Sequence, residues 1–122
     1  MAVHLRGRND FQKVYRKGRR YDGSFISVFV LPNELSCHRF GVTASKKALG
    51  KAVERNRAKR LLRESFRLSD NSLSVLVRTY DWVLNAKGRL AGRKMIVAFD
   101  EFTSVVKKVA GEERSTQLPE RS

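Results

Sequence analysis

The sequence predicts a small α+β protein made of one domain. Segments with the 3.6-residue period of a helix alternate with segments that have the two-residue period or the β-branched composition of a strand. The chain has 122 residues, 41% of them hydrophobic, which is enough for the core of one compact domain. We find no internal repeat, linker or second domain, so we expect a single domain over residues 1–111. Residues 112–122 are predicted to form a flexible C-terminal tail.

The first predicted element is a short basic helix. Asn9 or Asp10 can cap its N-terminus, and Gly18 can end it. Phe11 and Tyr15 lie on one face of this helix, among several arginines and lysines. From the residues alone, two interpretations of these rings remain open: they pin the helix to the domain, or they stack on unpaired nucleotides.

Two strands are predicted next. Residues 25–31 are rich in aromatic and β-branched side chains, which indicates a strand with two largely apolar faces inside the sheet. Residues 38–45 alternate apolar and polar side chains, which is typical of a half-buried strand. We expect the two strands to pair as an antiparallel hairpin. Arg39 would lie on its polar face, and Lys46 and Lys47 follow directly.

A basic amphipathic helix is predicted over residues 52–68, after Gly50. Ala58, Leu61 and Leu62 follow helical spacing and indicate the face that packs on the core. The opposite side has a row of polar and positively charged side chains: Asn56, Lys59, Arg60, Arg63 and Arg67, with Arg55 and Arg57 at its borders. Like charges at this spacing repel one another, so we expect this face to bind a polyanion.

The remaining predicted elements are a strand, a loop and a last helix. Residues 81–87 indicate a strand with Trp82 in the core, followed by a glycine-containing loop. Residues 99–109 keep a helical period, which predicts a helix that covers the sheet. Residues 95–98 fit either a short edge strand or an early helical turn, so the conformation of residues 88–98 stays open.

The charge of the chain indicates nucleic acid as its first candidate partner. There are 26 lysines and arginines against 12 aspartates and glutamates, a net charge of +14. No apolar run approaches the roughly 20 residues of a membrane-spanning helix, and the N-terminus lacks the apolar segment of a secretory signal. We therefore expect a cytoplasmic protein. The single cysteine, Cys37, has no partner for an intramolecular disulfide.

The sequence contains no evident catalytic or metal site. Paired carboxylates, a cluster of metal ligands and a nucleophile with a neighbouring base are all absent from it. His4 and His38 are far apart in the sequence, and we expect both at the surface. We therefore predict no catalytic residue and no tightly bound metal or cofactor in this protein.

Four segments of the chain match one known family in their order and separation. The most specific is Arg55-Asn56-Arg57, followed by Lys59, Arg60, Arg63 and Glu64. The supporting matches are Asp10-Phe11 with Val14 and Gly18, residues 39–47, and residues 81–87. On these motifs the chain resembles the protein component of bacterial ribonuclease P over roughly the whole domain.

The resemblance implies an α+β sandwich with the element order αβββαβα. In that fold the basic helix, called the RNR helix, lies in a left-handed crossover between two parallel strands, whereas the general preference is for right-handed crossovers. The first strand of this order would come from the segment around residues 20–23.

The resemblance also implies a function. In bacterial ribonuclease P, a catalytic RNA removes the 5′ leader of precursor tRNA with bound Mg²⁺, and the protein enlarges the substrate-binding surface. The implied partners are that RNA and the precursor tRNA leader, with no DNA and no membrane. The residues implied to bind RNA are Lys46, Lys47, Lys51, Arg55, Asn56, Arg57, Lys59, Arg60, Arg63 and Arg67. Those implied to line a cleft for the single-stranded leader are Phe11 and Tyr15, with Phe25, Arg39 or Thr43 from the sheet.

Three other classes of function compete with the resemblance. A ribosomal or ribosome-associated RNA-binding protein with no role in cleavage would have the same charge and the same small build, and it stays the alternative. An independent nuclease would need a catalytic constellation that the sequence lacks. A DNA-binding helix-turn-helix module would need a second helix before the basic one, where residues 38–45 indicate a strand.

Overall fold

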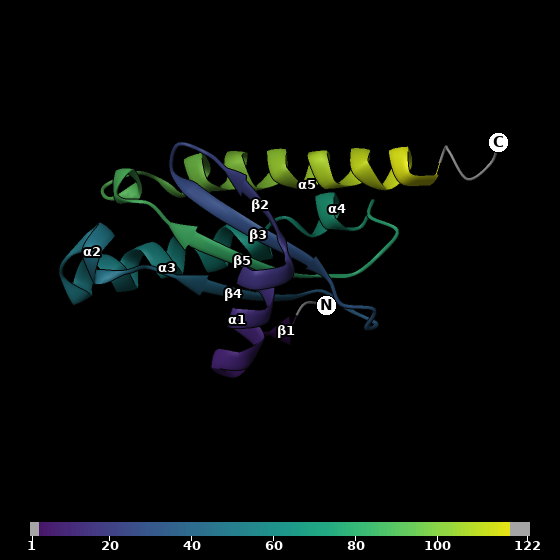
Figure 1. Ribbon diagram of the computed structural model, residues 1–122. Helices are drawn as coiled ribbons and strands as arrows, with labels where there is room; N and C mark the ends of the chain where they lie inside the picture. The colour runs from purple at the N-terminus through teal and green to yellow at the C-terminus, as the bar shows by residue number, and fades with distance from the viewer. Residues whose placement is uncertain (1–2, 118–122) are drawn as a thin grey trace.

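The computed structural model describes residues 3–117 as one five-stranded sheet with helices on both faces (Figure 1). The strands are β1 (Val3–His4), β2 (Arg19–Asp22), β3 (Ile26–Pro32), β4 (Arg39–Thr43) and β5 (Tyr80–Ala86). The helices are α1 (Gly7–Lys17), α2 (Lys46–Leu49), α3 (Ala52–Arg67), α4 (Asp70–Leu73), the 3-10 turn η1 (Gly88–Leu90) and α5 (Met95–Gln117). The longer elements follow the predicted order αβββαβα, and β2 is the strand expected near residues 20–23. Among the described helices, none has the length and apolar character needed to span a membrane.

The strand order in the sheet is β1-β4-β5-β3-β2. β5 pairs parallel with β4 and antiparallel with β3, so it lies between them and the predicted hairpin of residues 25–31 with residues 38–45 is wrong. The physical reason is burial: nearly every residue of β5 is buried, which only a central position in the sheet allows. The parallel pairing of β4 with β5, with α3 between them in the chain, is the arrangement that the predicted crossover requires.

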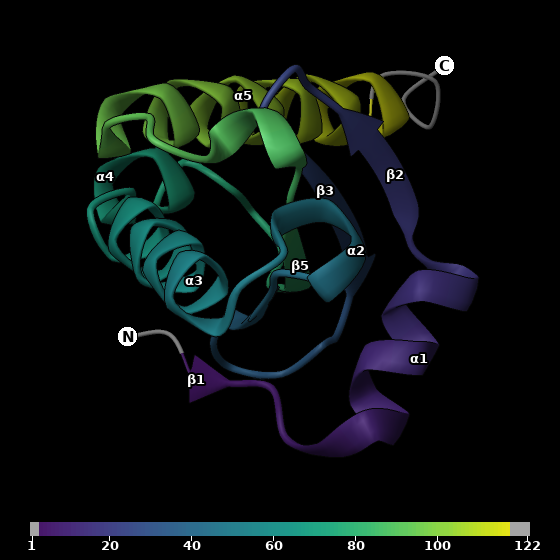
Figure 2. The same cartoon turned by 90° about the vertical axis from the view of Figure 1, so that its left-hand side faces the viewer.

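The two faces of the sheet are covered by different helices. α3 and α5 lie together on one side, and α1 lies on the other (Figure 2). The larger core, under α3 and α5, contains a cluster of four rings, with neighbouring centroids 4.3 to 6.4 Å apart: Phe40, Phe66, Trp82 and Phe102. The smaller core, under α1, contains Leu5, Val14 and Val83. Trp82 is fully buried, as predicted.

α1 begins earlier than predicted. Arg6 is its N-cap residue, so Asn9 and Asp10 lie inside the helix and do not cap it. The Asp10 carboxylate instead accepts the backbone N–H of Arg6 at 3.2 Å, which satisfies one of the free donors at the helix start. Gly18 ends the helix as predicted, although its φ is negative. A Cβ at Gly18 would lie 2.5 Å from the carbonyl oxygen of Val14, so close packing is what requires glycine here.

Residues 88–98, whose conformation the sequence left open, form η1, a short link and the first turn of α5. Residues 95–98 are therefore helical. Leu90 is fully buried and anchors η1 in the larger core. Gly92 has a φ of 74°, which lets the chain turn from η1 toward α5 at little steric cost.

α5 also extends beyond the predicted end of the domain at residue 111. It continues to Gln117, so residues 112–117, predicted as part of the C-terminal tail, belong to this helix. The reason lies in contacts with distant parts of the chain: the hydroxyl of Tyr21 donates to Glu112, and the hydroxyl of Tyr80 donates to Glu113. Burial, followed by the hydrogen bond to Glu112, raises the pKa of Tyr21 to about 12. Residues 118–122 of the predicted tail lie outside the described residues.

His38 is half-buried at the edge of the larger core, so the prediction of a surface residue is wrong for it. Its Nδ1 accepts the backbone N–H of Tyr80 at 3.0 Å and the indole N–H of Trp82 at 3.1 Å. A ring nitrogen that accepts hydrogen bonds is unprotonated, so His38 is neutral. Burial lowers the pKa of His38 below its usual value. His4 is exposed, as predicted.

We expect mild acid to destabilise the protein through His38. The unfolded chain protonates this histidine with a pKa of about 6.5, whereas the folded state resists protonation because its Nδ1 accepts two hydrogen bonds. The free energy of unfolding should therefore fall as the pH decreases below about 6.5. Urea unfolding over a series of pH values measures this slope. His38→Gln keeps an acceptor but does not titrate, so it should remove most of the slope; an unchanged slope would contradict the assignment.

Candidate nucleic-acid interface

α3 exposes its cations on one side because its other side is buried. Ala58, Leu62, Ser65 and Phe66 are at most 3% exposed and pack toward the sheet and α5. The Ser65 hydroxyl donates to the carbonyl oxygen of Leu61 at 2.8 Å, so this polar residue is buried without an unpaired hydroxyl hydrogen. The helix is therefore fixed in its rotation about its axis, and the basic side faces away from the core.

The residues predicted to bind RNA lie on α2, on α3 and between the two helices. The exposed ones are Lys46, Lys47, Lys51, Asn56, Arg60, Arg63 and Arg67, and the half-buried ones are Arg55, Arg57 and Lys59. Within residues 3–117, only Arg67 of this set forms an ion pair, with Glu64 at 2.6 Å. The Nε of Arg55 is buried and lacks a hydrogen-bond partner in the same part of the chain. We call this set the basic row.

Three lysines lie just before the first turn of α3. Ser45 caps α2, and its hydroxyl oxygen accepts the backbone N–H of Ala48 at 3.0 Å. Gly50 has a φ of 73°, which permits the sharp change of direction between α2 and α3. Lys46 and Lys47 belong to the first turn after this cap, and Lys51 is the N-cap residue of α3. α2 and the start of α3 thus lie at the same end of the molecule (Figure 1).

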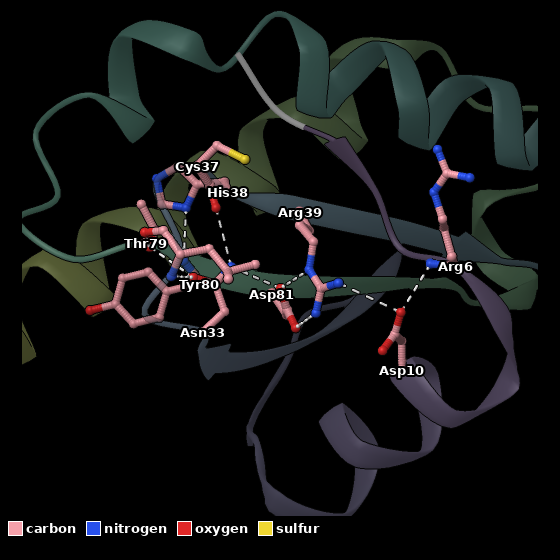
Figure 3. Close-up of polar contacts among 10 residues, drawn as sticks. Arg6, Asp10, Asn33, Cys37, His38, Arg39, Thr79, Tyr80 and Asp81 are labelled. Carbon is pink, nitrogen blue, oxygen red and sulfur yellow. Dashed lines mark hydrogen bonds and ion pairs between the residues drawn. The ribbon is translucent and has the colours of Figure 1, made fainter.

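Arg39, predicted for the leader cleft, is bound to carboxylates. Its Nε and Nη2 donate to the two oxygens of Asp81 at 2.8 and 2.7 Å, and its Nη1 lies 3.6 Å from Asp10 (Figure 3). Asp81 is almost fully buried and also accepts a hydrogen bond from Asn33 at 2.9 Å. The hydrogen bonds from the guanidinium to Asp81 raise the pKa of Arg39. The structure therefore gives Arg39 a stabilising partner that the sequence analysis did not foresee, because nothing in the sequence set the register of residues 38–45 against residues 81–87.

A second surface lies on the α1 side of the sheet. We call it the aromatic surface and define it by Phe11, Tyr15, Phe29, Thr43 and Asn85. The ring of Phe11 lies against Gly41 of β4, where a Cβ would be 2.3 Å from the ring, so glycine makes this contact possible. The ring of Tyr15 meets Phe29 edge-on, with centroids 4.8 Å apart, and Tyr15 is 37% exposed. Phe11 packs against the smaller core, as the first interpretation of the rings expects, whereas Tyr15 keeps an accessible face and stays a candidate for stacking on nucleotides.

Asn85 connects α1 to the sheet within the aromatic surface. Its Oδ1 accepts the hydroxyl hydrogens of Tyr15 at 2.9 Å and of Thr43 at 2.6 Å. Its Nδ2 has no hydrogen-bond partner among the described residues, so it remains available as a donor. The sequence analysis missed Phe29 and Asn85. The signal that could have indicated this face is the position of Asp81 and Asn85, two polar residues on the same face of an otherwise apolar strand.

Phe25, the third aromatic residue predicted for the leader cleft, contacts a different set of residues. Its ring packs against the larger core and lies 5.7 Å from the Arg89 guanidinium and 5.3 Å from that of Arg93. It is not part of the aromatic surface. The predicted cleft residues therefore divide into three groups: Phe11, Tyr15 and Thr43 come together, Arg39 pairs with Asp81, and Phe25 lies with two arginines.

In the described part of the chain, no group of three or more His, Cys, Asp or Glu side chains is arranged to hold a metal ion. Several carboxylates accept hydrogen bonds from backbone N–H groups instead. Glu101 accepts those of Ser24, Phe25 and Ile26, at 2.7 to 3.0 Å, and Glu113 accepts those of Val77 and Arg78. These acids fix loops to α5.

Comparison with known proteins identifies the family. The family model described as ribonuclease P matches residues 2–110. The ribonuclease P protein component of Caldanaerobacter subterraneus subsp. tengcongensis is 38% identical over 104 residues, which cover 85% of this chain and 86% of that protein. The corresponding protein of Clostridium kluyveri is 34% identical over 99 residues, covering 81% and 87%.

Solved structures agree with this result. The ribonuclease P protein of Staphylococcus aureus superimposes with a TM-score of 0.74 at 27% identity, covering 89% of this chain and 96% of that one. The protein from Thermotoga maritima superimposes with a TM-score of 0.73 at 25% identity, covering 86% and 96%. Fold, sequence and family model therefore lead to the same conclusion. The chain belongs to the ribonuclease P protein family.

Proposed function

We propose that this chain is the RNA-binding subunit of ribonuclease P, which helps the catalytic RNA to remove the 5′ leader from precursor tRNA. The observation that carries the proposal is the basic row, most of which is exposed and which, apart from Arg67, is free of ion pairs within residues 3–117. Membership of the ribonuclease P protein family supports it. The ribosomal alternative gains no support, because the relatives described above are all ribonuclease P proteins.

The basic row would bind phosphates of the catalytic RNA and of the nearby substrate. Guanidinium groups suit this task because they stay charged and donate several hydrogen bonds in a fixed plane. Arg60 and Arg63 are exposed and lie on the outer side of α3, where no acid neutralises them within the described residues. Each phosphate contact releases condensed counterions, so affinity should depend strongly on salt. The row would also reduce the repulsion between two RNA molecules that must approach each other.

The aromatic surface would bind the single-stranded leader. Unpaired bases stack on exposed rings, and each stacked base contributes about 1–3 kcal/mol. Tyr15 offers such a ring, and its edge-on contact with Phe29 and its hydrogen bond to Asn85 hold it in place. The Nδ2 of Asn85 would donate to an acceptor of the bound nucleotide. Phe11 would contribute mainly by holding α1 against the sheet, since its ring already packs on Gly41.

The chemical step would belong to the RNA, which would also hold the Mg²⁺ ions. Three carboxylates of the protein suit this division of work, since Arg39 binds Asp81 and backbone N–H groups bind Glu101 and Glu113. The protein residues would bind, orient and neutralise charge. Side chains of the basic row and the aromatic surface would transfer no proton.

Tyr15→Ala should weaken binding of leader-bearing precursor tRNA to the reconstituted holoenzyme by roughly 5- to 150-fold, as expected for the loss of one stacked base. Binding of mature tRNA, which has no leader, should stay within about twofold of the wild type, because Tyr15 then contacts no nucleotide. Equilibrium binding of the two RNAs by the holoenzyme measures both values and tests the proposed function directly.

The matched control for this experiment is Tyr15→Phe. It keeps the ring and loses only the hydrogen bond to Asn85, so its affinity for precursor tRNA should stay close to that of the wild type. Equal losses on precursor and mature tRNA in Tyr15→Ala would assign Tyr15 to folding instead of leader binding.

A further inference from the structure

Two arginines outside the basic row share one aromatic ring. The guanidinium carbons of Arg89 and Arg93 lie 5.7 and 5.3 Å from the ring centroid of Phe25, within the range of cation–π contacts. Both arginines are exposed, and Phe25 is half-buried against the larger core. The ring thus gives two surface guanidinium groups a common support.

The segment that presents these arginines is held firmly. Leu90 lies between the two arginines in the sequence and is fully buried. Its backbone N–H donates to the carbonyl oxygen of Lys87 at 3.0 Å. The N–H of Arg93 in turn donates to the carbonyl oxygen of Leu90 at 3.0 Å. The ring of Phe25 is fixed through its backbone, since its N–H donates to Glu101 and its carbonyl oxygen accepts the N–H of Lys87. Ordering these arginines on binding a ligand therefore costs less entropy than ordering flexible surface side chains.

The charges on this segment lack acidic partners. Within residues 3–117, neither Arg89 nor Arg93 forms an ion pair, and the same holds for the neighbouring Lys94. The arginines of the edge strand β2 differ: Arg19 pairs with Glu112, and Arg20 pairs with Asp22. Uncompensated positive charge on a fixed support is suited to binding an anion.

The two arginines also adjoin the basic row. The Nη2 of Arg57 donates to the carbonyl oxygen of Arg93 at 3.4 Å, which links α3 to the segment before α5. A Cβ at Gly88 would lie 2.9 Å from the carbonyl oxygen of Ala48, so η1 packs closely against α2. Figures 1 and 2 agree that the green turn at residues 88–90 and α2 lie at the same end of the molecule. The positive surface therefore continues from α2 and α3 onto this turn.

We propose that Arg89 and Arg93, supported by Phe25, form a further phosphate-binding site that holds an RNA backbone beside the basic row. This proposal rests on the proposed function and extends the RNA contact surface to the segment between β5 and α5. Guanidinium groups bind phosphate oxygens through paired hydrogen bonds, and such contacts carry no base specificity. The phosphates can belong to the catalytic RNA or to precursor tRNA, and the experiment separates these sources.

The test compares two double variants that each remove two positive charges. Arg89→Gln/Arg93→Gln alters the proposed site, and Lys107→Gln/Lys108→Gln removes two exposed charges from α5 as the control. Binding is measured as a function of salt, first to the catalytic RNA alone and then to precursor tRNA by the assembled holoenzyme. The arginine variant should lower the slope of log affinity against log salt by about one to two, and the lysine variant should change it much less.

A lowered slope with the catalytic RNA alone assigns the phosphates to that RNA, and a lowered slope only with precursor tRNA assigns them to the substrate. Equal slopes in both double variants would overturn the proposal. Failure of the proposed function is a separate outcome, because then the wild-type protein itself would not assemble with the RNA. Phe25→Leu keeps both arginines and an apolar side chain, so it should weaken RNA binding with little change in the salt slope. Thermal unfolding confirms that each variant is folded.

Discussion

Arg39→Met should lower the free energy of unfolding by about 3 kcal/mol, because it leaves a buried carboxylate without its cation. The side chain of Asp81 is 4% exposed, and both of its oxygens accept hydrogen bonds from the Arg39 guanidinium. Asn33 would remain as a partner of Asp81, but a single amide cannot replace a bidentate cation. Since small domains have total stabilities of about 5–15 kcal/mol, this single change should be readily visible in urea unfolding.

The double variant Arg39→Met/Asp81→Asn should be more stable than Arg39→Met alone. Asparagine at this position keeps a hydrogen-bonding group for Asn33 but no longer buries an unpaired charge. Losses that simply add in the double variant would show that the two side chains do not interact as the structure indicates. If this double variant also keeps its preference for precursor over mature tRNA, Arg39 is excluded from leader binding.

Arg60→Gln/Arg63→Gln should weaken binding to the catalytic RNA and lower the slope of log affinity against log salt by about two, one for each lost phosphate contact. Both side chains are exposed, form no ion pair in the described part of the chain, and lie on the side of α3 away from the core. The substitution should leave stability unchanged or slightly higher, because it removes repulsion between like charges. Salt-dependent binding and thermal unfolding measure the two effects separately.

Arg67→Gln provides a comparison within the same helix. Arg67 already pairs with Glu64, so its loss removes a partly compensated charge and should change the salt slope less than loss of Arg60 or Arg63. If all three arginines change the slope equally, the ion pair with Glu64 does not persist in the complex. If none of them changes it, the outer side of α3 does not contact RNA phosphates.

The sequence predicted α3 closely because local signals there agree. Helical spacing of apolar residues and Gly50 before the helix led to residues 52–68, and the helix spans Ala52–Arg67. The pairing of strands was not predictable in this way, since β3 and β4 are adjacent in sequence but β5 lies between them. Side-chain alternation defines the faces of a strand, whereas its neighbours depend on long-range burial.

The errors at the candidate site have the same origin. Arg39 lies beside Asp81 only because β4 pairs with β5 in this register. The ion pair of Arg39 could therefore not be predicted from the sequence of its own strand. Phe29 belongs to a segment that is apolar on both faces, so nothing in the sequence singled it out. The position of α1 leaves Phe29 half-buried next to Tyr15. The helical character of residues 112–117 likewise depends on partners far away in the chain, Tyr21 and Tyr80. The basic row, by contrast, follows from the period of one helix and needed no tertiary information.

We propose that the protein supplies binding surfaces while RNA supplies the chemistry. The most direct measurement is cleavage of a leader-bearing precursor tRNA at a Mg²⁺ concentration too low for a bacterial ribonuclease P RNA acting alone. We expect that adding this protein restores cleavage at the leader junction, that the protein without RNA cleaves nothing, and that Arg60→Gln/Arg63→Gln restores less. Cleavage by the protein alone, or no stimulation of the RNA by the folded wild-type protein, would contradict this proposal.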